Sequence, residues 1–372
     1  MKKKIYFLIN SLEAWWGERQ IVNLCNNFDP NQFDVTIITL KSQAFYTLHS
    51  NVRHISLSHI KRNFLMFLMI PYFVIKLRNI FKRENFDNGI STLEIANFVH
   101  LLAKKNALIY CVVSLNVFKW FIGGAHKLLI RLLYPRAQKI LANSAENTFD
   151  LAKYLSLPMQ KFDVLYNPID KDMVEQSAKE DIDTMIKNRI KNHKVFVTVW
   201  RLVWQKRHHR IISALSKIYK EKDKRFVYLI LWDWPEKRKL EKFVIKLWLQ
   251  DNVIFLWTQK NVFKYLNIAD CFLYASDYEW FPNVFVEAIL CKLPILTTNF
   301  KTWAQEAIFW EYTPHKIHYP CLWENWILLD AKMFEKQFFD VYDKLDTLKT
   351  QQKWLDNFLV DNVTKKAIQI LF

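Results

Sequence analysis

Short apolar runs alternate with longer segments of mixed polarity along most of the chain. Residues 4–9 and 33–40 are such runs, and the segment that starts near Glu18 between them spaces its apolar residues as an amphipathic helix does. An apolar run of about four to eight residues is typical of a strand buried on both faces of a sheet. The opening of the chain therefore predicts a strand, a helix and a second strand, which form a βαβ unit.

The same alternation continues toward the middle of the chain. A strand and a helix are expected in residues 89–103, a strand follows in 107–114, and residues 136–158 predict a strand and then a helix with Ser144 as its N-cap. A turn at Pro168 and a polar, charged stretch after it mark a domain boundary.

A second series of strands and helices follows this boundary. Its apolar runs are VFVTV, RFVYLIL, NVIFL, CFLYAS and PILTT, each separated from the next by a helical segment. About six such units imply a parallel, doubly wound sheet with its ligand at the carboxyl ends of the strands. Because 372 residues exceed what one core usually serves, we expect two domains of the α/β class. The tail predicts one or two amphipathic helices.

Composition excludes several classes of protein. A hydrophobic content of 51% excludes a disordered chain, and five cysteines without a close pair or a ligand-like spacing to the histidines favour reduced thiols and no zinc site. We therefore expect a cytoplasmic protein. The start MKKKIYFLIN runs into polar residues too soon for a signal peptide, so it is interpreted as the first strand.

The net charge of +17 calls for an anionic partner, for which nucleic acid, an acidic membrane and phosphorylated substrates are all candidates. The uncharged run of residues 63–75 is shorter than the roughly twenty residues needed to span a bilayer. With its basic ends it suits a helix that lies in the membrane surface and is broken near Pro71. An ordinary core helix with charged ends remains an alternative.

Two pairs of charged residues are candidates for a binding site. Glu279 lies in a loop after a predicted strand, and Glu287 lies inside the apolar helix that begins near Asn283, where a carboxylate needs a hydrogen-bonding partner. Arg201 and Lys206 follow another strand, and together they could hold a diphosphate, the arginine through its planar fork and the lysine as a point charge. Taken singly, each of these residues could instead be solvated or salt-bridged.

The two glutamates, separated by seven residues and followed by Ala288, resemble the donor-site signature of retaining glycosyltransferase family 4. The resemblance implies the GT-B fold, in which two Rossmann-like domains face each other across a cleft. It implies that Glu287 holds the ribose of a sugar nucleotide and that Glu279 lies beside the transferred sugar. Arg201 and Lys206 match the segment that grips the pyrophosphate. Further donor contacts are implied for Asn283, Val284 and Trp200.

The resemblance also assigns the domains and a loop near the start of the chain. Residues 1–168 would bind the acceptor, 169–355 would bind the nucleotide sugar, and a C-terminal helix in 356–372 would cross back to the first domain. The family usually has a Gly-Gly-Ala-Glu-Arg run where this chain has Trp15, Trp16 and Gly17, followed by matching Glu and Arg residues. In the family pattern, small residues at this helix N-terminus let backbone amides approach a phosphate or the acceptor.

Tryptophan stands at many positions where the family has glycine. The chain has four glycines and fifteen tryptophans, whereas average usage would give about 26 glycines. The ten tryptophans at such positions are Trp15, Trp16, Trp200, Trp232, Trp234, Trp248, Trp257, Trp280, Trp303 and Trp326. We hypothesise that the natural gene reads UGA as glycine and that these residues are glycine in the native protein.

The sequence thus predicts a retaining transferase that moves a hexose or N-acetylhexosamine from a nucleoside diphosphate sugar, with UDP as the expected nucleotide. The acceptor would be lipid-linked or a glycan in cell-envelope synthesis. The resemblance implies no metal and no cofactor, and we expect no nucleic-acid partner. The protein would lie on the inner face of the cytoplasmic membrane. A non-catalytic membrane scaffold and a sugar-nucleotide epimerase or phosphorylase of the same fold remain alternatives. No residue is identified as a general base.

Overall fold

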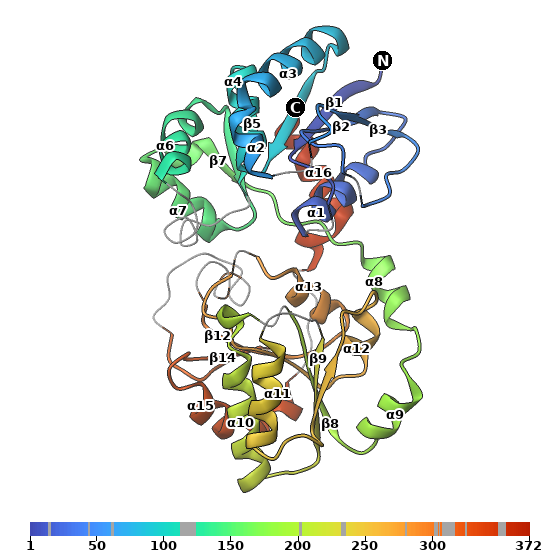
Figure 1. Ribbon diagram of the computed structural model, residues 1–372, viewed down its shortest axis with the longest axis vertical. Helices are drawn as coiled ribbons and strands as arrows, with labels where there is room; N and C mark the ends of the chain where they lie inside the picture. The colour runs from blue at the N-terminus through green and yellow to red at the C-terminus, as the bar shows by residue number, and fades with distance from the viewer. Residues whose placement is uncertain are drawn as a thin grey trace. The chain divides into compact units, whose positions relative to one another are not determined.

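In the computed structural model, the protein forms two compact units (Figure 1). Unit 1 comprises Met1–Ile169 together with Asp356–Phe372, and unit 2 comprises Asp170–Leu355. The structure describes residues 1–13, 16–43, 45–60, 63–111, 124–200, 203–231, 236–279, 281–300, 304, 306, 317–323, 326–348 and 355–372.

Unit 1 is built on a parallel sheet of seven strands in the order β3-β2-β1-β4-β5-β6-β7. The strands are β1 (Lys3–Ile9), β2 (Phe33–Thr39), β3 (Val52–Ser56), β4 (Asn88–Thr92), β5 (Leu108–Cys111), β6 (Lys139–Ala142) and β7 (Phe162–Val164). The last five residues of β1 are all buried, as expected for a central strand covered on both faces. The chain reverses its direction of winding between β1 and β4, which is the switch point of a doubly wound sheet.

Helices cover both faces of this sheet (Figure 1). They are α1 (Trp16–Asn26), α2 (Asn63–Leu68), α3 (Ile70–Glu84), α4 (Glu94–Ala103), α6 (Gly124–Leu133), α7 (Ala145–Leu155) and α16 (Val360–Leu371), with short 3-10 turns η1 (Tyr134–Arg136) and η2 (Met159–Lys161). Ser144 caps α7 by accepting a hydrogen bond from the amide of Asn147. The C-terminal helix α16 buries Val363, Ala367 and Leu371 in the core of unit 1.

Unit 2 is built on a second seven-stranded sheet, in the order β10-β9-β8-β11-β12-β14-β13. Its strands are β8 (Lys194–Val199), β9 (Phe226–Leu231), β10 (Val253–Leu256), β11 (Cys271–Tyr274), β12 (Ile295–Thr298), β13 (Cys321–Trp323) and β14 (Trp326–Leu329). All neighbours are parallel except the edge pair β13 and β14. The α/β class with two parallel, doubly wound sheets is therefore confirmed.

The helices of unit 2 are α8 (Lys171–Ala178), α9 (Thr184–Ile190), α10 (His208–Glu221), α11 (Lys237–Lys246), α12 (Phe263–Asn267), α13 (Asn283–Leu290) and α15 (Phe334–Val341), with 3-10 turns η3 (Trp204–Lys206), η4 (Tyr342–Thr347) and η5 (Leu355–Phe358), the last at the point where the chain returns to unit 1. The sequence did not predict two of these helices, α8 and α9. The polar stretch after Pro168 was expected to be a boundary segment, but it contains α8 and α9. Asp170 and Asp183 start these helices by accepting hydrogen bonds from their first turns.

The apolar, basic segment near Pro71 forms two helices, α2 and α3, with Pro71 in the first turn of α3. The break is therefore where the sequence predicted it. Helix α3 buries Phe73, Val74, Leu77 and Ile80. Among the described residues, no helix has the length and apolar content required to cross a bilayer.

Candidate active site

Two loops meet where neighbouring strands β8 and β11 end in unit 2. The first loop follows β8 and carries Lys206, and the second follows β11 and carries Glu279. The strand order changes direction between β8 and β11, so these loops lie at the switch point of the sheet. Doubly wound sheets bind ligands in this position because the loops on either side of it diverge.

Lys206 and Glu279 form a buried ion pair. The Nζ atom of Lys206 lies 2.5 Å from Oε1 of Glu279, and the two side chains are 3% and 4% exposed. The hydroxyl of Tyr274, at the end of β11, donates to the same carboxylate oxygen at 2.5 Å. Lys206 also lies 3.9 Å above the ring of Trp200. A buried charge is stable only when it is paired and hydrogen-bonded, and here the cation and the carboxylate satisfy each other.

Further contacts hold these two loops together. Asp277 accepts hydrogen bonds from Nε of Arg207 at 2.6 Å and from Nη1 of Arg210 at 2.7 Å. The amide of Asp277 donates to the carbonyl of Gln205 at 3.1 Å, and the side chain of Gln205 donates to the carbonyl of Tyr278 at 2.6 Å. Because the bonds link residues on both sides of Lys206 to the two residues that precede Glu279, they fix the position of the ion pair.

Glu287 lies in the middle of α13, whose eight residues are all buried. A helix that is apolar on every side belongs in a core, so a carboxylate at 2% exposure is an exception that requires a function or a specific partner. The negative charge of Glu287 contributes, after burial itself, to raising the pKa of the Cys291 thiol to about 12. Asn283 and Val284 are buried in the first turn of the same helix.

The structure brings only some of the predicted residues together. It pairs Lys206 with Glu279 and places Trp200 against Lys206, and it puts Glu287, Asn283 and Val284 on the helix that follows. Arg201, Trp15 and Trp280 lie outside the described residues, as do Trp232, Trp234 and Trp303. Trp16 starts α1 but its side chain is not described, and Gly17 lies in the first turn of α1.

Sequence reasoning missed Tyr274. It also missed the contacts of Asp277 with Gln205, Arg207 and Arg210, which are called the clamp below. Tyr274 was interpreted as part of an apolar strand, and its position at the strand end was the available signal. Asp277 lies two residues before Glu279, and its arginine partners belong to the basic stretch after Lys206. The contacts of Asp277 depend on β8 and β11 being neighbours, which the sequence order does not state, whereas Tyr274 and Glu279 are only five residues apart in the chain.

Unit 1 has a buried carboxyl at the corresponding edge of its own sheet. Glu18 lies in the first turn of α1, after β1, and is 5% exposed. Burial raises its pKa to about 7. The nearby Lys41 is paired with Glu13 at 2.7 Å. Glu18 thus changes protonation close to neutral pH, a property shared with many groups in functional sites.

The described residues contain no cluster of three or more histidine, cysteine, aspartate or glutamate side chains placed to hold a metal ion. The described groups near the ends of β8 and β11 include the buried cation of Lys206, the carboxylates of Asp277 and Glu279 and the phenol hydroxyl of Tyr274.

Two family models match the chain, one mainly in unit 1 and the other in unit 2. The model described as "Glycosyl transferases group 1" matches residues 180–311, and the model described as "Glycosyltransferase Family 4" matches residues 17–173. The first includes Lys206, Glu279 and Glu287, and the second includes Glu18.

Two curated relatives are similar in sequence. The chain is 28% identical over 314 residues to the N-acetylgalactosamine-N,N'-diacetylbacillosaminyl-diphospho-undecaprenol 4-alpha-N-acetylgalactosaminyltransferase of Campylobacter jejuni, covering 82% of this chain and 83% of the relative. It is 30% identical over 245 residues to a glycosyltransferase of Methanocaldococcus jannaschii described as uncharacterized, covering 65% of this chain and 59% of that relative.

Solved structures share the fold at lower identity. A glycosyltransferase from Rickettsia africae ESF-5 superimposes with a TM-score of 0.75 at 17% identity, covering 100% of this chain and 98% of the other. Anabaena HepE in complex with UDP and glucose gives a TM-score of 0.73 at 16% identity, covering 99% of each chain. These similarities identify the fold as GT-B.

Proposed function

The chain belongs to the group 1 glycosyltransferases, and on that basis we propose that it transfers a hexose or N-acetylhexosamine from a nucleoside diphosphate sugar, with UDP as the nucleotide, to a lipid-linked acceptor with retention of configuration. The observation that carries this proposal is the buried pair of Lys206 and Glu279 at the switch point of unit 2. A buried lysine at this position can neutralise the diphosphate as it leaves, and that is the step where negative charge accumulates.

In this proposal the donor enters by competing for Lys206. Without a donor, the lysine is neutralised by Glu279, so its charge is satisfied inside the protein. A diphosphate offers more negative charge than one carboxylate, and Lys206 would move to it. The hydroxyl of Tyr274 would stay on Glu279 and keep that carboxylate hydrogen-bonded. Glu279 would then orient the donor sugar, and Glu287 would hold the ribose.

The transfer step breaks the bond between the sugar and the diphosphate and forms a bond to the acceptor hydroxyl on the same face. Lys206 and Arg201 would stabilise the departing diphosphate, and the acceptor proton would pass to one of its oxygens. The reaction as proposed needs no metal and no other cofactor. Tyr274 and the clamp formed by Asp277 would hold the loops in place during the step.

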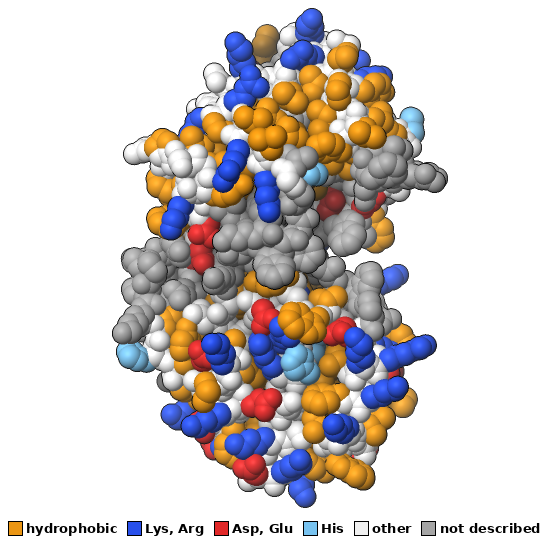
Figure 2. Space-filling model, turned by 60° about the vertical axis from the view of Figure 1, so that its left-hand side comes forward, with side chains coloured by type: hydrophobic (Ala, Val, Ile, Leu, Met, Phe, Trp, Pro, Cys, Tyr) orange, Lys and Arg blue, Asp and Glu red, His pale blue; other side chains and the backbone are white. Residues whose placement is uncertain are grey.

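A lipid-linked acceptor is supported by the Campylobacter relative, whose name specifies a diphospho-undecaprenol substrate. Unit 1 also exposes apolar side chains beside basic ones. Leu68 is 70% exposed, Ile75 is 60% exposed, and Tyr72 lies between them, with Lys76 on the same helix. Figure 2 shows hydrophobic side chains gathered on unit 1, with lysine and arginine around them. We propose that α2 and α3 dock on the inner face of the cytoplasmic membrane.

The proposed reaction is tested by turnover of labelled nucleotide sugars. Purified protein is incubated with a panel of UDP-sugars and membranes that contain polyprenyl diphosphate sugars. Transfer is expected with at least one donor, and Glu287→Ala is expected to abolish it. Glu175→Ala, which removes an exposed carboxylate from unit 2, is the matched control and should retain transfer. Nucleotide binding without turnover would instead support a scaffold, and the absence of any nucleotide binding would overturn the proposal.

We also propose that glycine replaces several of the tryptophans in the native protein, and Trp248 supports this best. Trp248 has a φ of 61° and is 73% exposed. The amide of Leu249 bonds to the carbonyl of Val244 and the amide of Trp248 to that of Ile245, both at 3.1 Å. This is the Schellman arrangement at a helix end, whose left-handed residue is usually glycine.

Not every tryptophan in the set shows this property. Trp326 is 1% exposed in β14 and packs against Phe285, with ring centroids 5.3 Å apart. None of its contacts with the described residues requires glycine at this position. The nucleotide sequence decides the matter, because a UGG codon at Trp248 would exclude recoding there. Peptide masses from the native source provide the direct test.

A further inference from the structure

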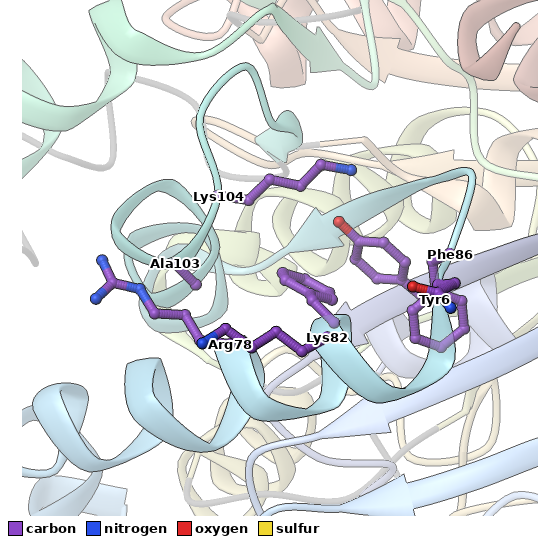
Figure 3. Close-up of a pocket in the computed structure, with 8 residues that line it drawn as sticks. Tyr6, Arg78, Lys82, Phe86, Ala103 and Lys104 are labelled. Carbon is purple, nitrogen blue, oxygen red and sulfur yellow. The ribbon is translucent and has the colours of Figure 1, made fainter.

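Unit 1 contains a cavity of about 550 Å³ that lies away from the carboxyl edge of its sheet. The cavity is bounded by the segments that lead into β4 and β5, so it lies at the amino-terminal edge (Figure 3). Ligands of doubly wound sheets normally bind at the opposite edge. The residues that determine its chemistry are Arg78, Lys82, Lys104, Tyr6, Phe81 and Phe86.

The lining is cationic and contains no acidic side chain among the described residues. Lys104 reaches in from the end of α4, whereas Arg78 and Lys82 come from α3 (Figure 3). Arg78 donates to the carbonyl of Leu102 at 2.7 Å, which ties the two helices together. The nearest carboxylate along α3, Glu84, is already paired with arginines outside the cavity, Arg53 and Arg83.

Lys104 is the most informative of the three cations. Its ammonium lies 5.7 Å from the ring centre of Tyr6 and 5.9 Å from that of Phe81, and no carboxylate pairs with it in the described part of the chain. Its pKa is lowered by burial. A partly buried cation that lies beside aromatic rings and lacks a carboxylate partner among the described residues is destabilised relative to water, and an anion bound in the cavity would remove that cost.

Hydrogen bonds fix the ring of Tyr6, which forms the aromatic floor of the cavity together with Phe81 and Phe86. The hydroxyl of Tyr6 lies 2.6 Å from Nε2 of His100, and Nδ1 of His100 lies 2.9 Å from Oγ of Ser91. Burial lowers the pKa of His100 to about 3, so the ring is neutral at pH 7. Ser91 donates onward to Asn97, so it accepts from Nδ1 and leaves Nε2 to accept from Tyr6. A floor fixed in this way needs no reordering when a ligand binds.

We propose that this cavity binds a phosphate ester, with the phosphate held by Lys104 and the apolar part of the ester lying on the rings of Tyr6, Phe81 and Phe86. Arg78 and Lys82, whose charged ends point away from the ammonium of Lys104 (Figure 3), add further positive charge to the lining. The phosphate can belong to a membrane lipid headgroup or to a soluble metabolite. The first source is compatible with the exposed apolar residues of α3, but the site itself does not depend on the proposed transfer reaction.

A purely structural role for the cations makes a different prediction. Lys82 and Lys104 lie at the ends of α3 and α4, where a positive charge stabilises the helix dipole. If that were their whole role, removing the charge of Lys104 would lower the melting temperature and would leave anion binding unchanged. If the cavity is an anion-binding site, removing the charge of Lys104 weakens anion binding.

Calorimetric titration of the full-length protein with phenyl phosphate tests the site. Lys104→Gln is expected to weaken binding by about tenfold or more, the usual effect of losing one charge-assisted hydrogen bond. Lys153→Gln makes the same charge change at an exposed position near the end of α7, outside the cavity, and should alter affinity less than about twofold. Equal losses in the two variants would overturn the proposal.

Vesicles distinguish the two sources of the phosphate. If the ligand is a lipid, vesicles of phosphatidylglycerol in phosphatidylcholine should displace phenyl phosphate from the wild type and bind Lys104→Gln more weakly than Lys153→Gln. If it is soluble, the vesicles should not compete. The proposal is overturned if phenyl phosphate shows no saturable binding and the two variants bind vesicles alike. UDP affinity, measured in the same samples, reports on unit 2 and should be equal in all three proteins.

Discussion

The ammonium of Lys206 lies 2.5 Å from the carboxylate of Glu279, although the two residues are 73 positions apart in the chain. Both are buried, so the carboxylate keeps the lysine from attracting an anion until one arrives that can displace it. In the proposed mechanism the donor diphosphate is that anion. In this mechanism Glu279 has two opposing effects on donor binding. It weakens binding because it competes with the diphosphate for Lys206, and it favours binding because it orients the sugar.

These effects separate when UDP, which lacks the sugar, is used as the ligand. Glu279→Gln should bind UDP about tenfold more tightly than the wild type, because the competing charge is gone and the buried lysine lacks a partner. Lys206→Met should bind UDP at least about tenfold more weakly. Isothermal calorimetry measures both affinities, and Glu175→Gln serves as the control for loss of a negative charge on unit 2. Weaker UDP binding by Glu279→Gln would contradict the competition.

The hydroxyl of Tyr274 is expected to matter only once the diphosphate is bound. It donates to Glu279 at 2.5 Å, and after Lys206 has moved it would be the described group that still holds the carboxylate. Tyr274→Phe keeps the ring, which packs 4.9 Å from Phe285, and should weaken UDP binding about tenfold. In a Glu279→Gln background the same substitution should have a much smaller effect, since the charge to be stabilised is absent.

Tyr228→Phe provides the matched control for that prediction. Tyr228 is a fully buried tyrosine of β9 in the same sheet, and its ring is part of the unit 2 core. Removing its hydroxyl should leave UDP affinity within about twofold of the wild type. Equal effects of the two tyrosine substitutions would show that the loss comes from disturbing the sheet and not from the contact with Glu279.

The pattern of apolar runs predicted the central strands of both sheets, because a strand covered on both faces must be apolar along its length. It did not predict α8 and α9, whose exposed, charged residues resemble a linker, nor the short antiparallel pair of β14 and the edge strand β13. Lys206, Glu279 and Glu287 were candidates from their positions after strands and inside an apolar helix. The pairing of Lys206 with Glu279 could not be predicted, since it depends on which strands are neighbours.

Trp248→Gly should stabilise the protein. The left-handed backbone at Trp248 is strained for any residue with a Cβ, and relief of that strain outweighs the greater freedom of glycine in the unfolded chain by about 1 kcal/mol. For a unit of this size the melting temperature should rise by about 2–4 °C. Trp248→Ala removes the exposed indole but keeps the Cβ, so it should give little of this gain. Equal stabilisation by both substitutions would show that the indole, and not the backbone, is the cause.

Membrane docking through α2 and α3 predicts that apolar contacts, as well as charge, are required. Leu68→Asp and Ile75→Asp each place a carboxylate where the structure exposes an apolar side chain, so folding should be unaffected while binding to anionic vesicles falls at least about tenfold. Met185→Asp is the control, because Met185 is an exposed apolar residue of unit 2 at 76% exposure. Vesicle flotation measures the bound fraction. Undiminished binding by both unit 1 variants would exclude this surface.

Two buried groups of unit 1 should give its stability opposite dependences on pH. His100 has a pKa of about 3, against its ordinary 6.5, because burial disfavours its charged form. As the pH falls, His100 therefore binds a proton in the unfolded chain but stays neutral in the folded chain. The free energy of unfolding falls by about 2 kcal/mol as the pH falls from 7.5 to 5. Glu18 has a pKa raised to about 7 by burial, against an ordinary 4.5. Here the folded chain holds the proton, so stability falls by about 2 kcal/mol as the pH rises over the same interval.

The two effects nearly cancel in the wild type, and substitution of one residue should reveal the other. His100→Gln removes the acid-side loss, so its stability should decrease as the pH is raised from 5 to 7.5. Glu18→Gln should show the reverse. Hydrogen exchange of β1 and α4, corrected for intrinsic rates, reports on unit 1 at each pH, and His193→Gln is the control for an exposed histidine. Titrating groups shared by both variants drop out of the comparison, so parallel pH profiles would contradict the assignment of these slopes to His100 and Glu18.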